Sequence, residues 1–393
     1  MEYKKIGDLT NVITGGTPST AKSEYWDSGD IPWLQSGCCQ NCDVDFAEKY
    51  ITQEGYDNSS TKLMPKNSVM IALTGATAGK IGYLNFEACG NQSITGILPC
   101  KVLNQRYLFY FLLSQRKKIL ADCIGGAQPH ISQGYVKNIQ VPILSLKKQK
   151  EIVDTLSCLL GIINKRQDEI RLLDNLIKAR FVELFGDPVA NPMKWSVKKL
   201  KDLSIQINSG NTPKGGSENY VEKGITFFRS QNVWKDRLEM DDVAYIDVET
   251  HSSMKRSSLK HGDILMTKTG RINTENSSLG RAALYDGEDD MANVNGHVYF
   301  IRLKEGVNNK FVLRILVSPE YRNLIRSVCV GGIDKRQLNK EHIEDFPIIC
   351  PPADMIDKYV VFVNQVDKSK VVAQHMLDEA QKLFESLMQE YFG

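Results

Sequence analysis

The chain has 393 residues, which is enough for two or three domains with hydrophobic cores, and its 49 Lys and Arg residues nearly balance its 47 Asp and Glu residues. This balance differs from the strongly basic composition of many nucleic-acid binders. We find no apolar run of 18 residues and no apolar leader at the start, so we expect a cytoplasmic protein that does not span a membrane. The nine cysteines show no disulfide spacing, and we interpret them as reduced thiols.

The first 144 residues mix short β-like runs with a helical pattern. A strand is predicted over 68–73 and a helix over 105–120, and Gly125–Gly126 stands where that helix is expected to stop. We therefore expect a mixed α/β domain with many loops in this part of the chain.

Two later stretches instead place their seam residues at alternating spacings of four and three. One runs over 146–184 and the other over 354–391. Five heptads in each predict a coiled-coil seam, and a helix of about 40 residues is roughly 60 Å long. Arg166, Arg180 and Lys370 interrupt the seam. Their stems either snorkel out of it, which we favour, or fix its register.

Residues 188–350 repeat the motifs of the first half in the same order. They also predict strands over 263–266 and 297–303, and a helix over 310–325 that stops near Gly331–Gly332. A duplication on this scale indicates two copies of one domain, because solenoid repeats run only about 20–50 residues. The matching segments, first-half copy first, are YKKIGDL (3–9) with VKKLKDL (197–203), ITGGTP (13–18) with INSGNTP (207–213), IPWLQS (31–36) with ITFFRS (225–230), IQVPI (139–143) with EDFPI (344–348), and FVELFGD (181–187) with LMQEYFG (387–393).

The stretch LTGATAGKIG is similar to a phosphate-binding P-loop but departs from it in two respects. Only three residues separate Gly75 from Gly79, where a P-loop has four, and Ile81 replaces the Ser or Thr that binds magnesium. The equivalent second-half loop, from Thr269–Gly270 to Gly280–Arg281, is six residues longer. A triphosphate cradle does not tolerate such an insertion, whereas a loop that reads a variable target does.

The CCQNC stretch raises the alternative of a zinc site. A structural zinc site requires four ligands, and no fourth ligand is evident beside Cys38, Cys39 and Cys42. The aligned second-half residues are not ligands either. We find no nucleophile or base partner for the isolated histidines His130, His261 and His297.

Taken together and in this order, these motifs resemble the specificity (S) subunit of type I restriction–modification enzymes, the HsdS family. The resemblance covers essentially the whole chain. It rests on the doubled layout with a long helix after each copy and on the segments GGTPS, GNTPKGG, GDIPWL, LTGATAGKIG, and FGD followed by NPMKW.

The resemblance implies an α+β (mixed) fold, with two similar globular target recognition domains joined and separated by two long antiparallel coiled-coil helices. The four segments are then recognition domain 1 (1–144), the first spacer helix (145–187), recognition domain 2 (188–350) and the second spacer helix (351–393). Each recognition domain is expected to read one half of a bipartite site in double-stranded DNA, and the helices are expected to set the gap.

The resemblance also implies partners that supply the chemistry. Two modification subunits are expected to bind S-adenosylmethionine and methylate adenine at N6, and restriction subunits add an ATP- and Mg-dependent nuclease. We expect no cofactor, metal or catalytic residue in this chain. The only Pro-Pro pair stands in CPPA and not in the tetrapeptide of adenine methyltransferases, and no G-x-G-x-x-G loop is present.

Candidate DNA contacts are polar side chains in the loops that both halves share, because such side chains read base edges and bind phosphates. Gln35 aligns with Arg229 and Gly37 with Gln231, so the halves are expected to read different sequences: Gln suits adenine and Arg suits guanine. Ordinary solvated loop residues remain the alternative for each candidate, and turn geometry is the favoured role of Gly15, Gly75, Gly210 and Gly270. The predicted set is Thr17, Ser19, Lys22, Gln35, Ser36, Thr74, Thr77, Lys80, Asn91 and Gln92 in the first half, and Thr212, Lys214, Arg229, Ser230, Gln231, Asn232, Lys268, Thr269 and Arg271 in the second.

Two other functions remain open at this point. One is a self-contained enzyme, either an NTPase that uses the Gly75–Lys80 loop or an unrecognised nuclease. The other is a protein scaffold that assembles through the coiled coil.

Overall fold

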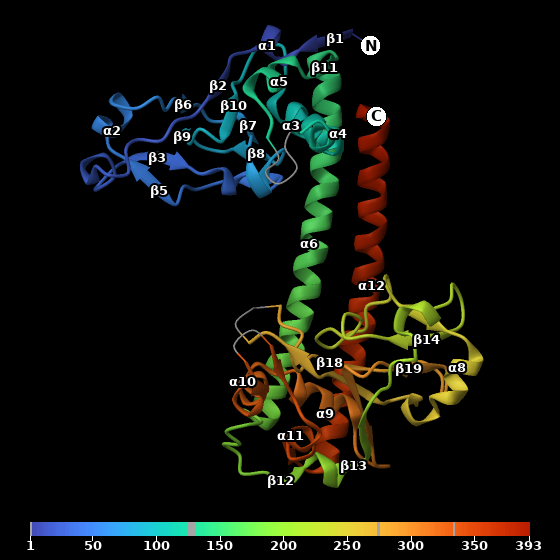
Figure 1. Ribbon diagram of the computed structural model, residues 1–393. Helices are drawn as coiled ribbons and strands as arrows, with labels where there is room; N and C mark the ends of the chain where they lie inside the picture. The colour runs from blue at the N-terminus through green and yellow to red at the C-terminus, as the bar shows by residue number, and fades with distance from the viewer. Residues whose placement is uncertain (1, 124–129, 273–275, 333–334) are drawn as a thin grey trace. The chain divides into compact units, whose positions relative to one another are not determined.

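The computed structural model describes residues 2–123, 130–272, 276–332 and 335–393 (Figure 1). The chain divides into two compact units, one of Met1–Ile170 with Val372–Gly393 and the other of Arg171–Val371. Each unit therefore includes part of both long helices, and we describe each unit by itself. The predicted helix stop at Gly125–Gly126 lies outside the described residues.

The first unit contains three sheets. The strand orders are β1-β11, β2-β10-β7-β8-β4 and β5-β3-β9-β6, and all pairs are antiparallel except β3 with β9 and β4 with β8. The strand predicted over 68–73 is confirmed as β7. The strands are β1 (Glu2–Lys5), β2 (Val12–Thr14), β3 (Ile31–Leu34), β4 (Cys42–Val44), β5 (Lys49–Ile51), β6 (Leu63–Met64), β7 (Val69–Ala72), β8 (Ile81–Leu84), β9 (Ala88–Gly90), β10 (Ile94–Ile97) and β11 (Gln140–Ile143).

The helix predicted over 105–120 is two helices. Asn104 caps the first by accepting hydrogen bonds from the backbone amides of Arg106 and Tyr107, and the chain leaves regular helix at Gln115, where φ is −80° and ψ is −2°. The helices of this unit are α1 (Ile6–Leu9), α2 (Gln53–Asp57), α3 (Gln105–Ser114), α4 (Arg116–Ala121) and α5 (Gln133–Asn138).

Aromatic side chains of α3 form much of the first unit's core. Phe109 packs edge-on against Tyr83 of the sheet, with ring centroids 6.0 Å apart. On its other face Tyr107 lies 5.2 Å from Phe392 of the last helix. Buried aromatic rings of this size dominate core energetics, so the sheet, α3 and the last helix form one packed body in this unit.

The second unit repeats most of this arrangement, without counterparts of β4 and β6 and with an additional sheet of order β17-β22-β21. The order β13-β20-β16-β18 matches β2-β10-β7-β8, the order β15-β14-β19 matches β5-β3-β9 with the same parallel central pair, and β12-β23 matches β1-β11. The duplication inferred from the motifs is thus confirmed in the topology. The strands are β12 (Ser196–Lys199), β13 (Ser204–Ser209), β14 (Ile225–Phe228), β15 (Ala244–Ile246), β16 (Ile264–Thr267), β17 (Thr269–Gly270), β18 (Ala282–Leu284), β19 (Ala292–Val294), β20 (Val298–Leu303), β21 (Val330–Gly331), β22 (Arg336–Gln337) and β23 (Pro347–Cys350).

The helix predicted over 310–325 is also two helices. Pro319 begins the second of them, and the side chain of Ser318 caps it by accepting from the amide of Tyr321, so the chain stops and restarts at this point. The second helix, α10, ends at Val328, so it stops near Gly331–Gly332 as predicted, although Gly331 itself lies in β21. The helices are α7 (Leu200–Leu203), α8 (Val248–Ser253), α9 (Asn309–Leu316), α10 (Pro319–Val328) and α11 (Lys340–Glu344).

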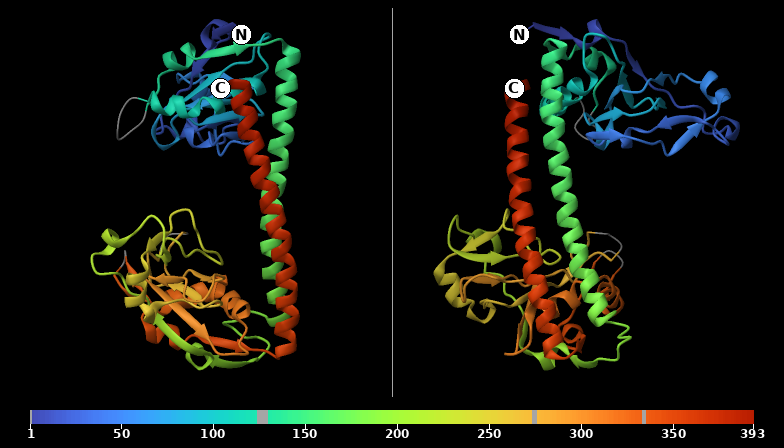
Figure 2. Two further views of the ribbon diagram at one scale, coloured as in Figure 1. Left: turned by 90° about the vertical axis from the view of Figure 1, so that its right-hand side faces the viewer. Right: turned by 180° about the vertical axis from the view of Figure 1, so that it is seen from behind.

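Two helices of 40 residues each, α6 (Leu146–Phe185) and α12 (Ala353–Phe392), confirm the predicted long helices (Figure 2). Gly186 ends α6 with φ of 74°, a left-handed conformation that favours glycine. No helix in the described ranges is both long and apolar enough to cross a membrane.

The two long helices run antiparallel where they meet in each unit. In the second unit Phe185 packs against Tyr359, with centroids 5.5 Å apart, while Asp174 pairs with Lys370 at 2.6 Å. In the first unit Ile163 forms a small core with Leu377 of α12. The favoured snorkelling interpretation does not hold for Lys370, because its ammonium group bridges the two helices.

The other two seam interruptions behave differently from Lys370. Arg166 and Arg180 pair with Glu169 and Glu183, each one turn further along α6, at 2.5 and 2.8 Å. Both side chains are more than a third exposed, so their charged ends turn along the helix surface, as snorkelling predicts.

Candidate nucleic-acid interface

Four loops of the first unit emerge at the same edge of its sheets. β3 and β9 are parallel, so the loops that follow them start side by side. β2 and β7 both run antiparallel to β10, so their carboxyl ends also share one edge. We call the loops 15–19, 35–40, 74–80 and 91–93 the reading edge of the first half.

The 91–93 loop joins the others together. The Asn91 amide donates to Leu34 O at 2.9 Å, and the Leu73 amide donates to Ser93 O at 2.8 Å. Among side chains, Thr17 Oγ1 donates to Gln92 Oε1 at 2.5 Å and Thr74 Oγ1 donates to Ser93 Oγ at 2.8 Å. The structure therefore brings Thr17, Thr74, Asn91 and Gln92 of the predicted set into one hydrogen-bonded surface.

At Gly15 the neighbouring backbone lies too close to allow a side chain. A Cβ on Gly15 would lie 2.0 Å from Gly90 O, and a Cβ on Gly210 would lie 1.9 Å from Val294 O. The two halves therefore need glycine at equivalent positions, and at Gly75 the φ of 71° gives a conformational reason instead. The predicted turn geometry therefore fits Gly75, whereas close approach is the reason at Gly15 and Gly210, and Gly270 lies in strand β17.

The second unit has an equivalent reading edge, formed by the loops 210–214, 229–232, 268–271 and 295–297. The Asn295 amide donates to Phe228 O at 3.0 Å and the Lys268 amide donates to His297 O at 2.8 Å, as Asn91 and Leu73 do in the first half. Thr269 and Gly270 form β17, which pairs with Gln337 and Arg336 of β22. The same topology thus presents a different set of side chains.

Asp242 binds two of the predicted DNA-contacting residues of this second edge, Arg229 and Gln231. The guanidinium of Arg229 lies 3.0 Å from Asp242 Oδ1, and Gln231 Nε2 donates to Asp242 Oδ2 at 2.6 Å. The hydrogen bond from Gln231, and next the one from Arg229, lowers the pKa of Asp242 below its usual range. Both side chains therefore occupy fixed positions beside an ionised carboxylate.

Asn232 has a structural role that does not fit its predicted contact with DNA. Its side chain is 1% exposed, donates to the carbonyls of Glu239 and Asp242, and accepts from the amide of Arg229. A buried and fully occupied amide cannot reach a base. Asn232 shapes the loop that presents Arg229 and Gln231.

The remaining predicted residues differ in exposure and in their partners. Lys22 is exposed and donates to the Tyr25 hydroxyl at 2.8 Å, and this bond raises its pKa. Lys80 donates to Gln40 Oε1 at 2.5 Å, and Lys268 lies 5.7 Å from the centroid of the Tyr299 ring. Thr77 Oγ1 donates to Thr74 O at 3.4 Å. The other exposed members are Ser19, Gln35, Thr212, Lys214 and Arg271, and the half-buried members include Ser36, Thr77, Ser230 and Thr269.

Sequence reasoning missed several polar residues at these edges. Asn295 is the counterpart of Asn91, and His297 is the counterpart of Ser93. The shared Asn in CGNQS and NVNGH was a usable signal, although the surrounding residues differ. Gln337 was not identifiable in this way, because only the pairing of β17 with β22 brings it to the edge.

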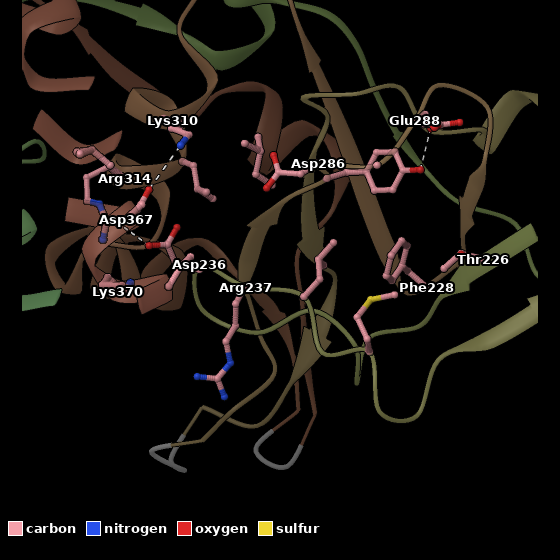
Figure 3. Close-up of a pocket in the computed structure, with 18 of the residues that line it drawn as sticks. Thr226, Phe228, Asp236, Arg237, Asp286, Glu288, Lys310, Arg314, Asp367 and Lys370 are labelled. Carbon is pink, nitrogen blue, oxygen red and sulfur yellow. Dashed lines mark hydrogen bonds and ion pairs between the residues drawn. The ribbon is translucent and has the colours of Figure 1, made fainter. Parts of the chain in front are cut away.

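A pocket of about 750 Å³ in the second unit shares no residue with the predicted set (Figure 3). Its cations face carboxylates: Arg314 lies 2.5 Å from Asp236, and Lys310 lies 3.5 Å from Asp367. With its cations neutralised in this way, the pocket offers no excess positive charge for a phosphate, and we assign it no part in DNA binding.

The cysteines of the CCQNC stretch lie on a short 3-10 turn and on β4. Cys39 is fully buried in the core beside Val44, whereas Cys42 is exposed. Within the part of the chain that the structure describes, no group of three or more His, Cys, Asp or Glu side chains could hold a metal ion.

Comparison with known proteins assigns the duplicated fold to a family. The family model described as "Type I restriction modification DNA specificity domain" matches twice, over residues 1–172 and 192–375. The chain belongs to this family of type I restriction–modification specificity proteins. Each match covers one sheet assembly with its reading edge, so the family's domain is the duplicated unit described above.

Individual relatives agree with this assignment. The chain is 25% identical over 418 residues to the type I restriction enzyme MjaIX specificity subunit of Methanocaldococcus jannaschii, covering 98% of this chain and 91% of the relative. It is 23% identical over 413 residues to the EcoKI specificity subunit of Escherichia coli, covering 98% and 87%. The crystal structure of the S subunit of the type I system from M. genitalium matches with a TM-score of 0.60 and 16% identity, over 100% of this chain and 96% of that chain, and this likeness supports the fold alone.

Proposed function

We propose that this specificity protein gives a type I restriction–modification enzyme its DNA address, with each reading edge recognising one half of a split site. The observation that carries this proposal is the duplication itself. Two equivalent edges have the same backbone hydrogen bonds but different side chains, with Gln35 in one half where Arg229 stands in the other. One scaffold that presents two sets of readers suits two different half-sites.

The long helices are proposed to fix the distance between the half-sites. Each runs without a break for 40 residues, or about 60 Å, which exceeds the roughly 34 Å between half-sites one helical turn apart. A rigid spacer of this kind lets two domains that each bind DNA weakly bind a split site tightly together, because the second contact forms at high effective concentration.

The chemistry is proposed to reside on partner subunits. We propose that two modification subunits carry S-adenosylmethionine and methylate adenine, and that restriction subunits bring ATP and magnesium. We also propose a cytoplasmic location, where the DNA is. The nearly neutral charge of the chain supports this division, since a protein of small net charge binds DNA weakly by itself.

The test is a methylome. The chain is produced together with its genomic modification partner in a host that lacks adenine methylation, and modified adenines are mapped by single-molecule sequencing. A split motif with a fixed gap is expected. An assembled, cofactor-loaded complex that methylates no adenine, or one contiguous motif, would refute the proposal.

A further inference from the structure

A pair of basic residues occupies the same place beside each reading edge, and the repeated motifs identified only one member of each pair. In the first half Ile119 of α4 packs against Gly79, and in the second half Ile325 of α10 packs against Gly280. A Cβ on either glycine would lie 3.1 or 2.8 Å from the isoleucine Cγ2, so the contacts are equivalent. Both glycines also have positive φ, 71° and 65°.

This shared contact aligns basic residues that are far apart in the sequence. Lys80 follows Gly79 as Arg281 follows Gly280. Three residues before each isoleucine, and thus on the adjacent turn of the helix, stand Arg116 and Arg322. We call Lys80 with Arg116, and Arg281 with Arg322, the basic pairs.

The charges of the basic pairs are not neutralised by carboxylates. None of the ion pairs among the described residues involves any of the four. Lys80 donates to the side-chain carbonyl of Gln40, and both Arg281 Nε and Arg322 donate to the single carbonyl Ser277 O, at 3.0 and 3.4 Å. The Nε of Arg116 is buried without a hydrogen-bond partner.

The two arginines of the second half stay close despite their like charges. Burial first, and then the charge of Arg322, lowers the pKa of Arg281, and burial followed by the charge of Arg326 lowers that of Arg322. By contrast, Arg229, Arg302 and Arg314 of this unit each face an aspartate. A group of guanidiniums without a carboxylate suits an external anion.

The position of the basic pairs beside the reading edges indicates which anion they bind. Lys80 and Arg281 end the loops that begin at Thr74 and Thr269, so each pair borders its reading edge. Arg281 is 6% exposed and its guanidinium lies 3.8 Å from the centroid of the Trp234 ring, so it contributes positive charge without contacting a ligand itself. The half-buried Arg322 can contact a ligand.

We propose that each basic pair binds backbone phosphate of the half-site that its reading edge reads, through Arg116 in the first half and Arg322 in the second. This inference rests on the proposed function. It adds a division of labour: loop side chains read bases, and the basic pairs hold the DNA backbone without reading sequence.

The experiment measures DNA affinity of the assembled complex with its modification partner at several salt concentrations. The probes are a duplex that carries the motif found by the methylome and a motif-free duplex of equal length. R116A and R322A are each expected to lower the slope of log K against log salt by about 0.9, which corresponds to about fivefold weaker binding near 0.15 M salt. Binding to both duplexes should weaken alike, and the methylated motif should not change.

Two controls keep the outcome interpretable. R322K retains the charge and should keep most of the affinity, which a loss of folding would not explain. R256A removes an exposed arginine that belongs to neither basic pair, in the 3-10 helix Lys255–Ser257 that precedes β16, and it should leave the slope unchanged.

Other outcomes would overturn the inference. An unchanged slope in folded R116A and R322A complexes would mean that the pairs do not touch phosphate. A loss confined to one base position would make Arg322 a base reader. If the wild-type complex binds neither duplex and methylates nothing, the proposed function itself fails. That failure is seen in the wild type, whereas failure of this inference is seen only in the variants.

Discussion

At the scale of single residues, the second reading edge is a fixed network rather than a set of free side chains. Asp242 orients both Arg229 and Gln231, and the buried Asn232 holds the loop beneath them. An arginine fixed by an aspartate keeps part of its donor fork for a ligand, and the preferred base partner of such a fork is guanine.

Replacing Arg229 by Ala should therefore relax one base position in one half-site only. We expect discrimination at that position to fall by about 1–3 kcal/mol, because the arginine's base contact is lost. Competition binding with duplexes mutated at each position of the motif measures this. Equal weakening across all duplexes would instead identify a phosphate contact.

Asp242 provides a second prediction, because this exposed carboxylate contacts both Arg229 and Gln231. D242N removes the charge that orients Arg229 while it keeps the shape of the side chain. We expect the same base position to relax, less strongly than in R229A, with the other half-site unchanged. The methylated motif shows the preference at that base position and the sequence of the other half-site. A variant indistinguishable from wild type would show that Arg229 is positioned by the DNA alone.

At the scale of elements, a largely buried ion pair joins two neighbouring strands of the second unit. Asp263 is 1% exposed and receives two hydrogen bonds from Arg302, from Nε at 2.9 Å and from the guanidinium end at 2.7 Å. Burial raises the pKa of Asp263, and the charge and hydrogen bonds of Arg302 oppose this rise. The pair joins the start of β16 to β20.

R302M should destabilise the protein by about 3–5 kcal/mol near neutral pH, because it leaves a buried carboxylate with the Lys260 amide as a donor but without its cationic partner. A carboxyl group with a raised folded-state pKa favours the folded state when protonated, so its penalty grows as pH rises through that pKa. The stability lost in R302M should therefore partly return on acidification toward pH 5. Urea unfolding at several pH values tests this, and a loss that is independent of pH would contradict it.

The elements also show what sequence reasoning could supply. Strong periodicity predicted α6 and α12 to within two residues at each end, and repeated motifs predicted the duplication. The breaks at Gln115 and Ser318 were missed because apolar spacing continues across them. The basic pairs were missed for a related reason: Arg116 and Arg322 have no shared motif, and only the packing of Ile119 and Ile325 against glycine aligns them.

At the scale of the whole molecule, the long helices are proposed to act as a spacer between two independent reading edges. Inserting four residues after Arg166 in α6, with a matched insertion after Leu377 in α12, adds about 6 Å of helix. The gap in the methylated motif should lengthen while both half-site sequences stay the same. A change in either half-site sequence would show that the helices shape the reading edges themselves.

The central claim is that each half reads its own half-site, and a methylome of a one-sided variant tests it most directly. Thr212, Arg229 and Gln231 are replaced together by Ala, and the first half is left intact. The account predicts that one half of the split motif loses its sequence preference, while the other half and the gap remain as in the wild type. Loss of preference in both halves, or in neither, would contradict it.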